Sequence, residues 1–144
     1  MSTRSNIVIK SGETKIFLYR HSDGYLAEAG YNLACSLMHS KGFKSFLNSL
    51  LSQKYEADTI REARSVYEFT TEQHGDIEYL YQFEFDVNIP GNVKVVVESV
   101  ASWDIKKTLI DTEFSLSHQN IREHLKPIFD EHNKVLQRSF SIAS

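Results

Sequence analysis

The turn between Tyr19 and Tyr25 gathers side chains suited to binding an anion. Arg20 is a permanent cation whose planar fork of donors matches a carboxylate or a phosphate. His21 titrates near neutral pH and can donate a hydrogen bond, accept one or bind a metal. A helix that begins here offers free backbone N–H groups, which favour anions, and the two tyrosines offer stacking faces. The turn predicts a pocket for a phosphorylated or nucleotide-like ligand.

A purely structural role is the alternative for the same turn. Arg20 can pair with Asp23, or with an acidic residue elsewhere, and so fix the backbone without meeting a ligand. Ser22 or Asp23 can cap the helix that follows. Both interpretations of the turn stay open at the level of sequence.

A second group of polar residues lies at His74-Gly75-Asp76-Ile77-Glu78. Alternation along a strand places Asp76 and Glu78 on one face, and paired carboxylates beside a histidine can do acid–base work or hold a divalent ion. The alternative is a hairpin turn with acidic residues on a solvated face. We include His74, Asp76 and Glu78 among the candidate ligand-binding residues, together with Tyr19, Arg20, His21, Asp23 and Tyr25.

Signatures of established catalytic classes are missing. The spacing of His118, His124 and His132 does not match helical zinc ligands, and no phosphate loop, nucleophile elbow or dinucleotide fingerprint occurs. The single cysteine, Cys35, falls between apolar positions of a helix and is expected to be packed. The sequence therefore predicts no catalytic residue, no metal site and no cofactor.

The turn must be positioned by a hairpin before it and a helix after it. Two β-rich segments, 6–10 and 14–21, are separated by Ser-Gly-Glu and predict a hairpin. Alternation puts Arg20 on the face of Leu18 and His21 on the face of Tyr19. Apolar residues then recur at helical spacing over 26–38 and again over 43–51, which predicts two helices.

The rest of the chain is rich in strand patterns. Strands are expected at 65–72, 76–87, 92–101 and about 108–114, and a last helix beyond residue 117 that Pro127 must kink or divide. In the second of these strands Ile77, Tyr81 and Val87 are expected on the core face, and the acidic residues on the wet face. The predicted fold is α+β: an antiparallel sheet of five to six strands, two helices after the first hairpin and a C-terminal helix against one face.

Composition narrows the class of protein. A chain of 144 residues with 41% hydrophobic residues predicts one globular domain spanning 1–144. A net charge of -3 and a pI near 6.1 argue against a dedicated nucleic-acid binder. One cysteine allows no internal disulfide, and neither a signal peptide nor a membrane-spanning run is present. We therefore expect a cytoplasmic protein.

The segment Tyr19-Arg20-His21-Ser22-Asp23-Gly24-Tyr25 resembles the Tyr-Arg-His-x-Asp-Gly-Tyr-Pro signature of a family of small, largely uncharacterised phage and prophage proteins. The stretch from His74 to Tyr79 is similar to a second motif of that family. Leu26 replaces the proline of the signature. The resemblance implies no activity, but it does imply a phage or prophage setting, in which accessory proteins counter host defence.

Three functions follow as hypotheses. The leading one is a non-enzymatic binding protein that sequesters a small anionic or nucleotide-type signal in the host cytoplasm. The second is an inhibitor that binds a host defence enzyme through an acidic strand face made by Glu78, Gln82, Glu84 and Asp86. The third is a small metal-dependent hydrolase that uses His74, Asp76 and Glu78. The aromatic second strand and the long final helix also favour a homo-oligomer.

Overall fold

A six-stranded sheet forms the centre of the protein. The computed structural model describes residues 3–55, 64–102, 105–117 and 120–143. In the order β3-β2-β1-β4-β5-β6, the strands are Glu68–Thr70, Thr14–Arg20, Ser5–Ser11, Tyr79–Phe85, Asn92–Ser102 and Ile105–Ser115. Four of the five pairings are antiparallel, whereas β1 and β4 run parallel. The predicted α+β class is confirmed, and the parallel pair at the centre is the departure from a wholly antiparallel sheet.

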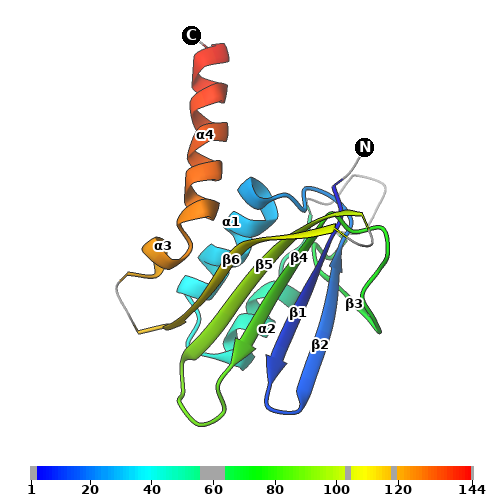
Figure 1. Ribbon diagram of the computed structural model, residues 1–144, viewed down its shortest axis with the longest axis vertical. Coiled ribbons are helices and arrows are strands. Elements are labelled where there is room, and N and C mark those ends of the chain that lie inside the picture. Colours follow the sequence, from blue (N-terminus) through cyan, green and yellow to red (C-terminus); the bar gives the residue numbers. More distant parts are fainter. Residues whose placement is uncertain (1–2, 56–63, 103–104, 118–119, 144) are drawn as a thin grey trace.

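The helices cover one face of this sheet (Figure 1). They are a π-helical turn η1 (Leu26–Gly30), α1 (Tyr31–Met38), α2 (Phe43–Leu51), α3 (Ile121–His124) and α4 (Lys126–Ala143). Their apolar stripes pack on the strands because burying that surface is the main favourable term in folding. The main core includes Ile7, Leu18, Leu33, Phe46, Tyr81, Phe83, Val95, Ile110, Leu125 and Ile128.

Within the residues that the structure describes, no helix covers the opposite face of the sheet (Figure 1). A smaller cluster of buried side chains forms there from Val8, Tyr19, Ile77 and Leu80, with Phe17 packed against it. The assignment of Ile77 to the face of Tyr81 is therefore wrong, because β4 begins only at Tyr79 and strict alternation does not hold before it. Val87 is also outside the core, with 62% of its surface exposed.

The turn after β2 is fixed by a close backbone approach. Gly24 donates its backbone N–H to the carbonyl of Thr3 at 2.9 Å, and Tyr81 donates its hydroxyl to the carbonyl of Gly24 at 2.8 Å. A Cβ atom at Gly24 would lie 2.9 Å from Ser5 Cβ and from Thr3 O, which is too close. Glycine is thus required here for space.

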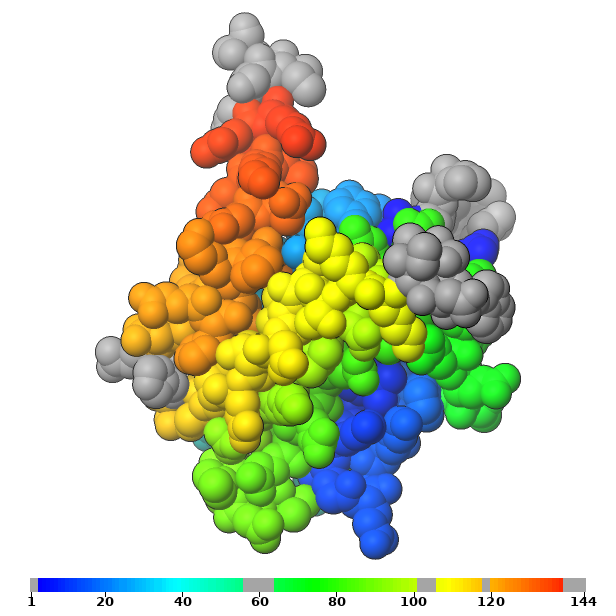
Figure 2. All heavy atoms as spheres, in the orientation of Figure 1, coloured from blue at the N-terminus to red at the C-terminus, as the bar shows by residue number. Residues whose placement is uncertain are grey.

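The last helical region is divided as expected. α3 ends at His124, and α4 restarts two residues later with Pro127 in its first turn, where the missing N–H costs nothing. Figures 1 and 2 show that the C-terminal turns of α4 project beyond the rest of the molecule. No helix among the described residues is long and apolar enough to cross a membrane.

Candidate functional site

Arg20 lies beneath the helical layer at the end of β2. Only 7% of its surface is exposed. Its Nε donates to the carbonyl of Ser22 at 2.8 Å, and its Nη1 donates to the hydroxyl of Tyr67 at 3.0 Å. The guanidinium also lies 5.4 Å from the centroid of the Tyr67 ring, a cation–π distance. The cation is therefore held by neutral groups and by an aromatic face.

These contacts continue into a polar network from separate parts of the chain. Tyr67 donates its hydroxyl to Asn32 Oδ1 in α1 at 2.7 Å, and the hydroxyls of Ser22 and Tyr55 lie 3.2 Å apart. We call Arg20, Ser22, Asn32, Tyr55 and Tyr67 the Arg20 network. Ser22, Asn32 and Tyr55 are half-buried, so the network reaches the surface.

The charge of Arg20 has no acidic partner among the residues that the structure describes. Buried charges are normally paired, because removing a charge from water is costly. Burial raises the pKa of Tyr67 to about 12, although the neighbouring Arg20 opposes the rise, so this hydroxyl stays protonated at neutral pH. The network thus offers one cation and several neutral hydroxyl groups, a combination that suits an anion.

His21 lies on the other face of the sheet, with Tyr19. The His74 ring stacks on the Tyr19 ring at 4.2 Å, and the His21 ring meets it edge-on at 4.5 Å. Tyr19 donates its hydroxyl to Asp76 Oδ2 at 3.1 Å. The outer partners are Arg4, 2.9 Å from Asp76, and Glu68, 3.0 Å from His21. We call these six residues the Tyr19 cluster: Arg4, Tyr19, His21, Glu68, His74 and Asp76.

The polar heads of the Tyr19 cluster already have protein partners. His74 lies 2.8 Å from the Thr70 hydroxyl, and its backbone N–H donates to Asn6 Oδ1 at 2.7 Å. Burial raises the pKa of Tyr19, and the hydrogen bond to Asp76 adds to the rise. Within the described residues no group of three or more His, Cys, Asp or Glu side chains could hold a metal ion. The cluster's contacts hold the residue 74–76 turn against β1 and β2.

The candidate residues thus divide between several places. One group brings together Tyr19, His21, His74 and Asp76, whereas Arg20 lies on the opposite face of the sheet. Arg20 and His21 therefore do not share a pocket. Asp23 is exposed, with a positive φ of 55°, and Arg20 binds the Ser22 carbonyl instead of it. Neither Ser22 nor Asp23 caps the helix, whose N-cap is Tyr25 without a side-chain bond.

Glu78, His124 and His132 belong to neither the Arg20 network nor the Tyr19 cluster. Glu78 is exposed, and its backbone N–H donates to the Arg4 carbonyl at 2.9 Å. His124 lies 2.9 Å from the Thr112 hydroxyl and stacks on Phe114. His132 lies 3.1 Å from the Ala27 carbonyl. His118 is outside the described residues.

Sequence reasoning missed three members of the Arg20 network. Tyr55 follows α2, and Tyr67 precedes β3 in a segment expected to be a plain strand. Asn32 lies in the predicted helix at a polar position. Nothing in the local pattern marks these residues, because their hydrogen bonds to Arg20, Tyr67 and Ser22 depend on how distant segments pack. The one signal in the sequence is the position of Arg20 at the end of a strand that is apolar on both faces, where an aromatic side chain can pack on the guanidinium.

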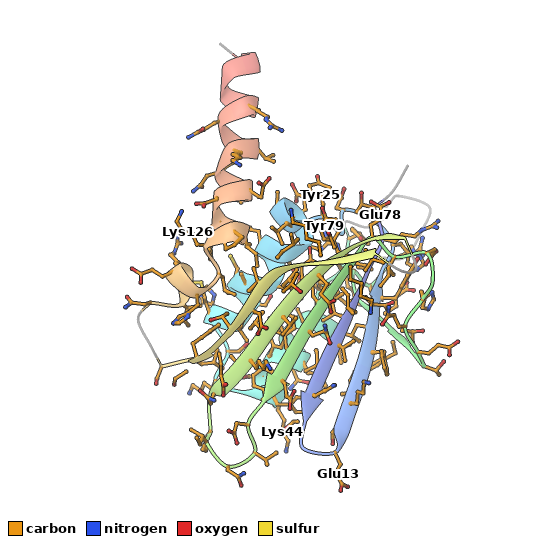
Figure 3. The ribbon with its side chains drawn as sticks, viewed as in Figure 1. Glu13, Tyr25, Lys44, Glu78, Tyr79 and Lys126 are labelled. Atoms are coloured by element: carbon orange, nitrogen blue, oxygen red, sulfur yellow. The ribbon has the colours of Figure 1, made fainter. Side chains whose placement is uncertain are left out.

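A groove opens between η1, the sheet and α4. It has a volume of about 450 Å³ and is lined by Tyr25, Leu26, Ala27, Tyr79, Leu109, Glu131, Val135 and Arg138. Figure 3 shows Tyr25 and Tyr79 near one another, to the right of α4 and level with its lower turns. Burial raises the pKa of Tyr79, and Glu78 and Glu131 add to the rise. Tyr25 therefore lines this groove, where burial raises the pKa of its hydroxyl and the charge of Arg20 opposes that rise.

The proposed acidic strand face is mixed in charge. The register places Lys10 of β1 and Lys94 of β5 on either side of Glu84. Gln82 donates to Glu98 Oε1 at 2.7 Å. Opposite charges on neighbouring strands stabilise a sheet. Lys10, Glu84 and Lys94 therefore stabilise the pairing of β1, β4 and β5, whether or not this face also binds a partner.

Comparison with known proteins adds no relative, since no protein-family model, curated protein or solved structure matches the chain.

Proposed function

We propose that the protein is a non-enzymatic binding protein that holds a small anionic ligand of the nucleotide type against the Arg20 network. The supporting observation is the guanidinium of Arg20, which is 7% exposed and bonded only to neutral groups among the described residues. An anionic ligand supplies the opposite charge that this cation lacks in the part of the chain that the structure describes, and charge-assisted hydrogen bonds are stronger than neutral ones.

The groups around Arg20 fit a phosphate better than a simple inorganic cation or an apolar molecule. A guanidinium has five N–H donors, of which the bonds to Ser22 and Tyr67 use two. The hydroxyls of Ser22 and Tyr55 can each turn to donate to a phosphate oxygen. The half-buried ring of Tyr55 and the amide of Asn32 then give a nucleoside a stacking face and polar partners.

The biological setting is also part of the proposal. The resemblance to phage and prophage proteins favours a counter-defence role, in which the protein sequesters a nucleotide signal in the cytoplasm of the host. Sequestration needs tight binding and no turnover. A cation and hydroxyl groups, as in the Arg20 network, can hold an anion by charge and hydrogen bonds without cleaving it.

Calorimetry with a panel of cyclic nucleotides and ADP-ribose derivatives tests the proposal. We expect at least one to bind the wild type, and Arg20→Ala to weaken that binding about tenfold or more, the scale of a lost charge-assisted contact. Tyr67→Phe keeps the cation and removes one partner, so it should weaken binding less. Arg4→Ala is the matched control, because Arg4 is exposed and lies in the Tyr19 cluster.

Circular dichroism of each variant separates loss of binding from loss of fold. If no nucleotide binds the wild type, or if folded Arg20→Ala binds as tightly as the wild type, the proposal is wrong.

The two other hypotheses stay predictions. Inhibition of a host enzyme through the strand face requires a protein partner whose binding is lost on charge reversal at Glu78 and Glu84 and kept in Arg20→Ala. A hydrolase requires activity with Mg²⁺, Mn²⁺ or Zn²⁺ that depends on His74 and Asp76. Both of these side chains already contact Tyr19, which makes the hydrolase the less supported of the two.

A further inference from the structure

The outer part of α4 projects from the body of the molecule (Figure 1). Near its start, Phe129 packs edge-on against Tyr31, and His132 stacks on the same ring at 3.5 Å and lies 3.1 Å from the Ala27 carbonyl. Beyond these contacts the helix projects away from the sheet and the other helices (Figure 1), and Leu136 is 43% exposed. Isolated helices are only marginally stable in water, so further burial of this exposed part of α4 would stabilise it.

One side of the same helix carries opposite charges at regular spacing. Glu131, Val135 and Arg138 all line the groove, at intervals of four and three residues that keep them on one stripe. A rise of 1.5 Å per residue puts Glu131 and Arg138 about 10 Å apart along the helix axis. The floor of the groove between them is apolar and includes Leu26, Ala27 and Leu109.

We propose that a second copy of this chain docks on this groove through its own α4, with the two helices antiparallel. A two-fold axis that passes near Val135 brings Glu131 of each copy opposite Arg138 of the other. Such an interface is isologous, as most homodimer interfaces are, because the same surface is used twice. The two helices then cover the apolar floor of each other's groove.

The order of the charges favours this arrangement over others. A parallel pair would place Glu131 against Glu131 and Arg138 against Arg138, and like charges at an interface are unfavourable. An antiparallel pair makes both contacts complementary. Lys134 lies 3.2 Å from Glu131 within the same helix, but an exposed pair of this kind contributes little and leaves Glu131 available to Arg138.

A charge-exchange experiment tests the reciprocal contact. Sedimentation or light scattering should show the wild type as a dimer, and Glu131→Arg and Arg138→Glu should each raise the dimer dissociation constant at least tenfold. Mixing the two variants should restore dimers, because one copy then carries two arginines and the other two glutamates at these positions. The double variant E131R/R138E should dimerise by itself.

Asp130→Arg provides the matched control. Asp130 is exposed, pairs with Lys126 at 2.7 Å, and is not among the residues that line the groove, so its reversal should leave the dimer unchanged. A monomeric wild type would overturn the proposal. So would a dimer that survives both single variants, or single-variant monomers that do not recombine on mixing while circular dichroism shows them folded. The proposal does not depend on the Arg20 network, and neither result decides the other.

Discussion

Arg20 and His21 are consecutive in the chain, yet their side chains lie on opposite faces of the sheet. The guanidinium of Arg20 donates to Tyr67 beneath the helices, whereas the imidazole of His21 lies 3.0 Å from Glu68 on the face that none of the described helices covers. The alternation of a strand requires this separation. One motif of the sequence therefore contributes to two unrelated groups of residues.

Removing the Tyr67 hydroxyl should destabilise the protein. Tyr67→Phe removes this partner from Nη1 of the buried Arg20 and from Oδ1 of the half-buried Asn32. We expect the free energy of unfolding in urea to fall by about 1–3 kcal/mol. Tyr25→Phe is the control, since no bond of its hydroxyl joins it to a described residue, and it should change stability by less than about 0.5 kcal/mol. An equal loss of unfolding free energy in Tyr67→Phe and Tyr25→Phe would contradict a stabilising role of the Arg20 network.

Stability should fall at alkaline pH because of the same residue. The pKa of Tyr67 is about 12 in the folded protein against 10.0 for an ordinary tyrosine, so the folded state holds this proton more tightly. Its contribution is complete below pH 10 and is lost as the pH rises from there toward 12, at about 1.4 kcal/mol per pH unit. Urea unfolding over this range should show a shallower loss for Tyr67→Phe than for the wild type. Burial also raises the pKa of Tyr81. Tyr81 is present in both proteins, so its contribution to the pH dependence cancels in the comparison.

Two glycines should respond in opposite ways to alanine. Gly24→Ala puts a methyl group 2.9 Å from Ser5 and Thr3, which should cost about 1–3 kcal/mol as β1 is displaced. At Gly42 no atom lies within 4 Å of the added carbon and the backbone is extended. Gly42→Ala should therefore be neutral or stabilise by about 0.4–1 kcal/mol. Thermal unfolding of the two variants checks the difference, and a similar loss in both would show that space is not the reason.

Asn6 should control the turn that carries His74. Its side chain is fully buried, donates to the Leu18 carbonyl at 2.9 Å and accepts from the His74 backbone N–H at 2.7 Å. Asn6→Ala should cost about 1–3 kcal/mol and leave that N–H unpaired. Amide exchange at His74 should then become faster. Asn92→Ala, which removes an exposed bond to Glu113, is the control, and unchanged protection of His74 in Asn6→Ala would contradict this role.

The sequence predicted the elements with strong local periodicity. The helices over 26–38 and 43–51 follow from apolar spacing, as does the separation of Arg20 from His21. Pro127 was expected to kink or divide the last helix, and the chain does break between α3 and α4. These features depend only on residues close in the chain, which is why a pattern reveals them.

Other features depend on contacts between distant segments. The parallel pairing of β1 with β4 has no local signature, because either strand also fits an antiparallel neighbour. The alternation assigns Ile77 to the wrong face because the strand begins at Tyr79, three residues later than the expected start at 76. Tyr67, which accepts from Arg20, comes from the region before β3, and its own partner Asn32 comes from α1; no spacing in the sequence connects them.

The parallel pair at the centre of the sheet has a consequence for synthesis on the ribosome. The register matches Ser5 with Tyr79, so β1 emerges long before the strand that completes it. Until then one edge of the first hairpin has unpaired backbone groups beside Ile7 and Ile9, and such an edge can recruit other chains. A nascent chain of this protein is therefore most exposed to aggregation while the ribosome is still translating the segment between the two strands.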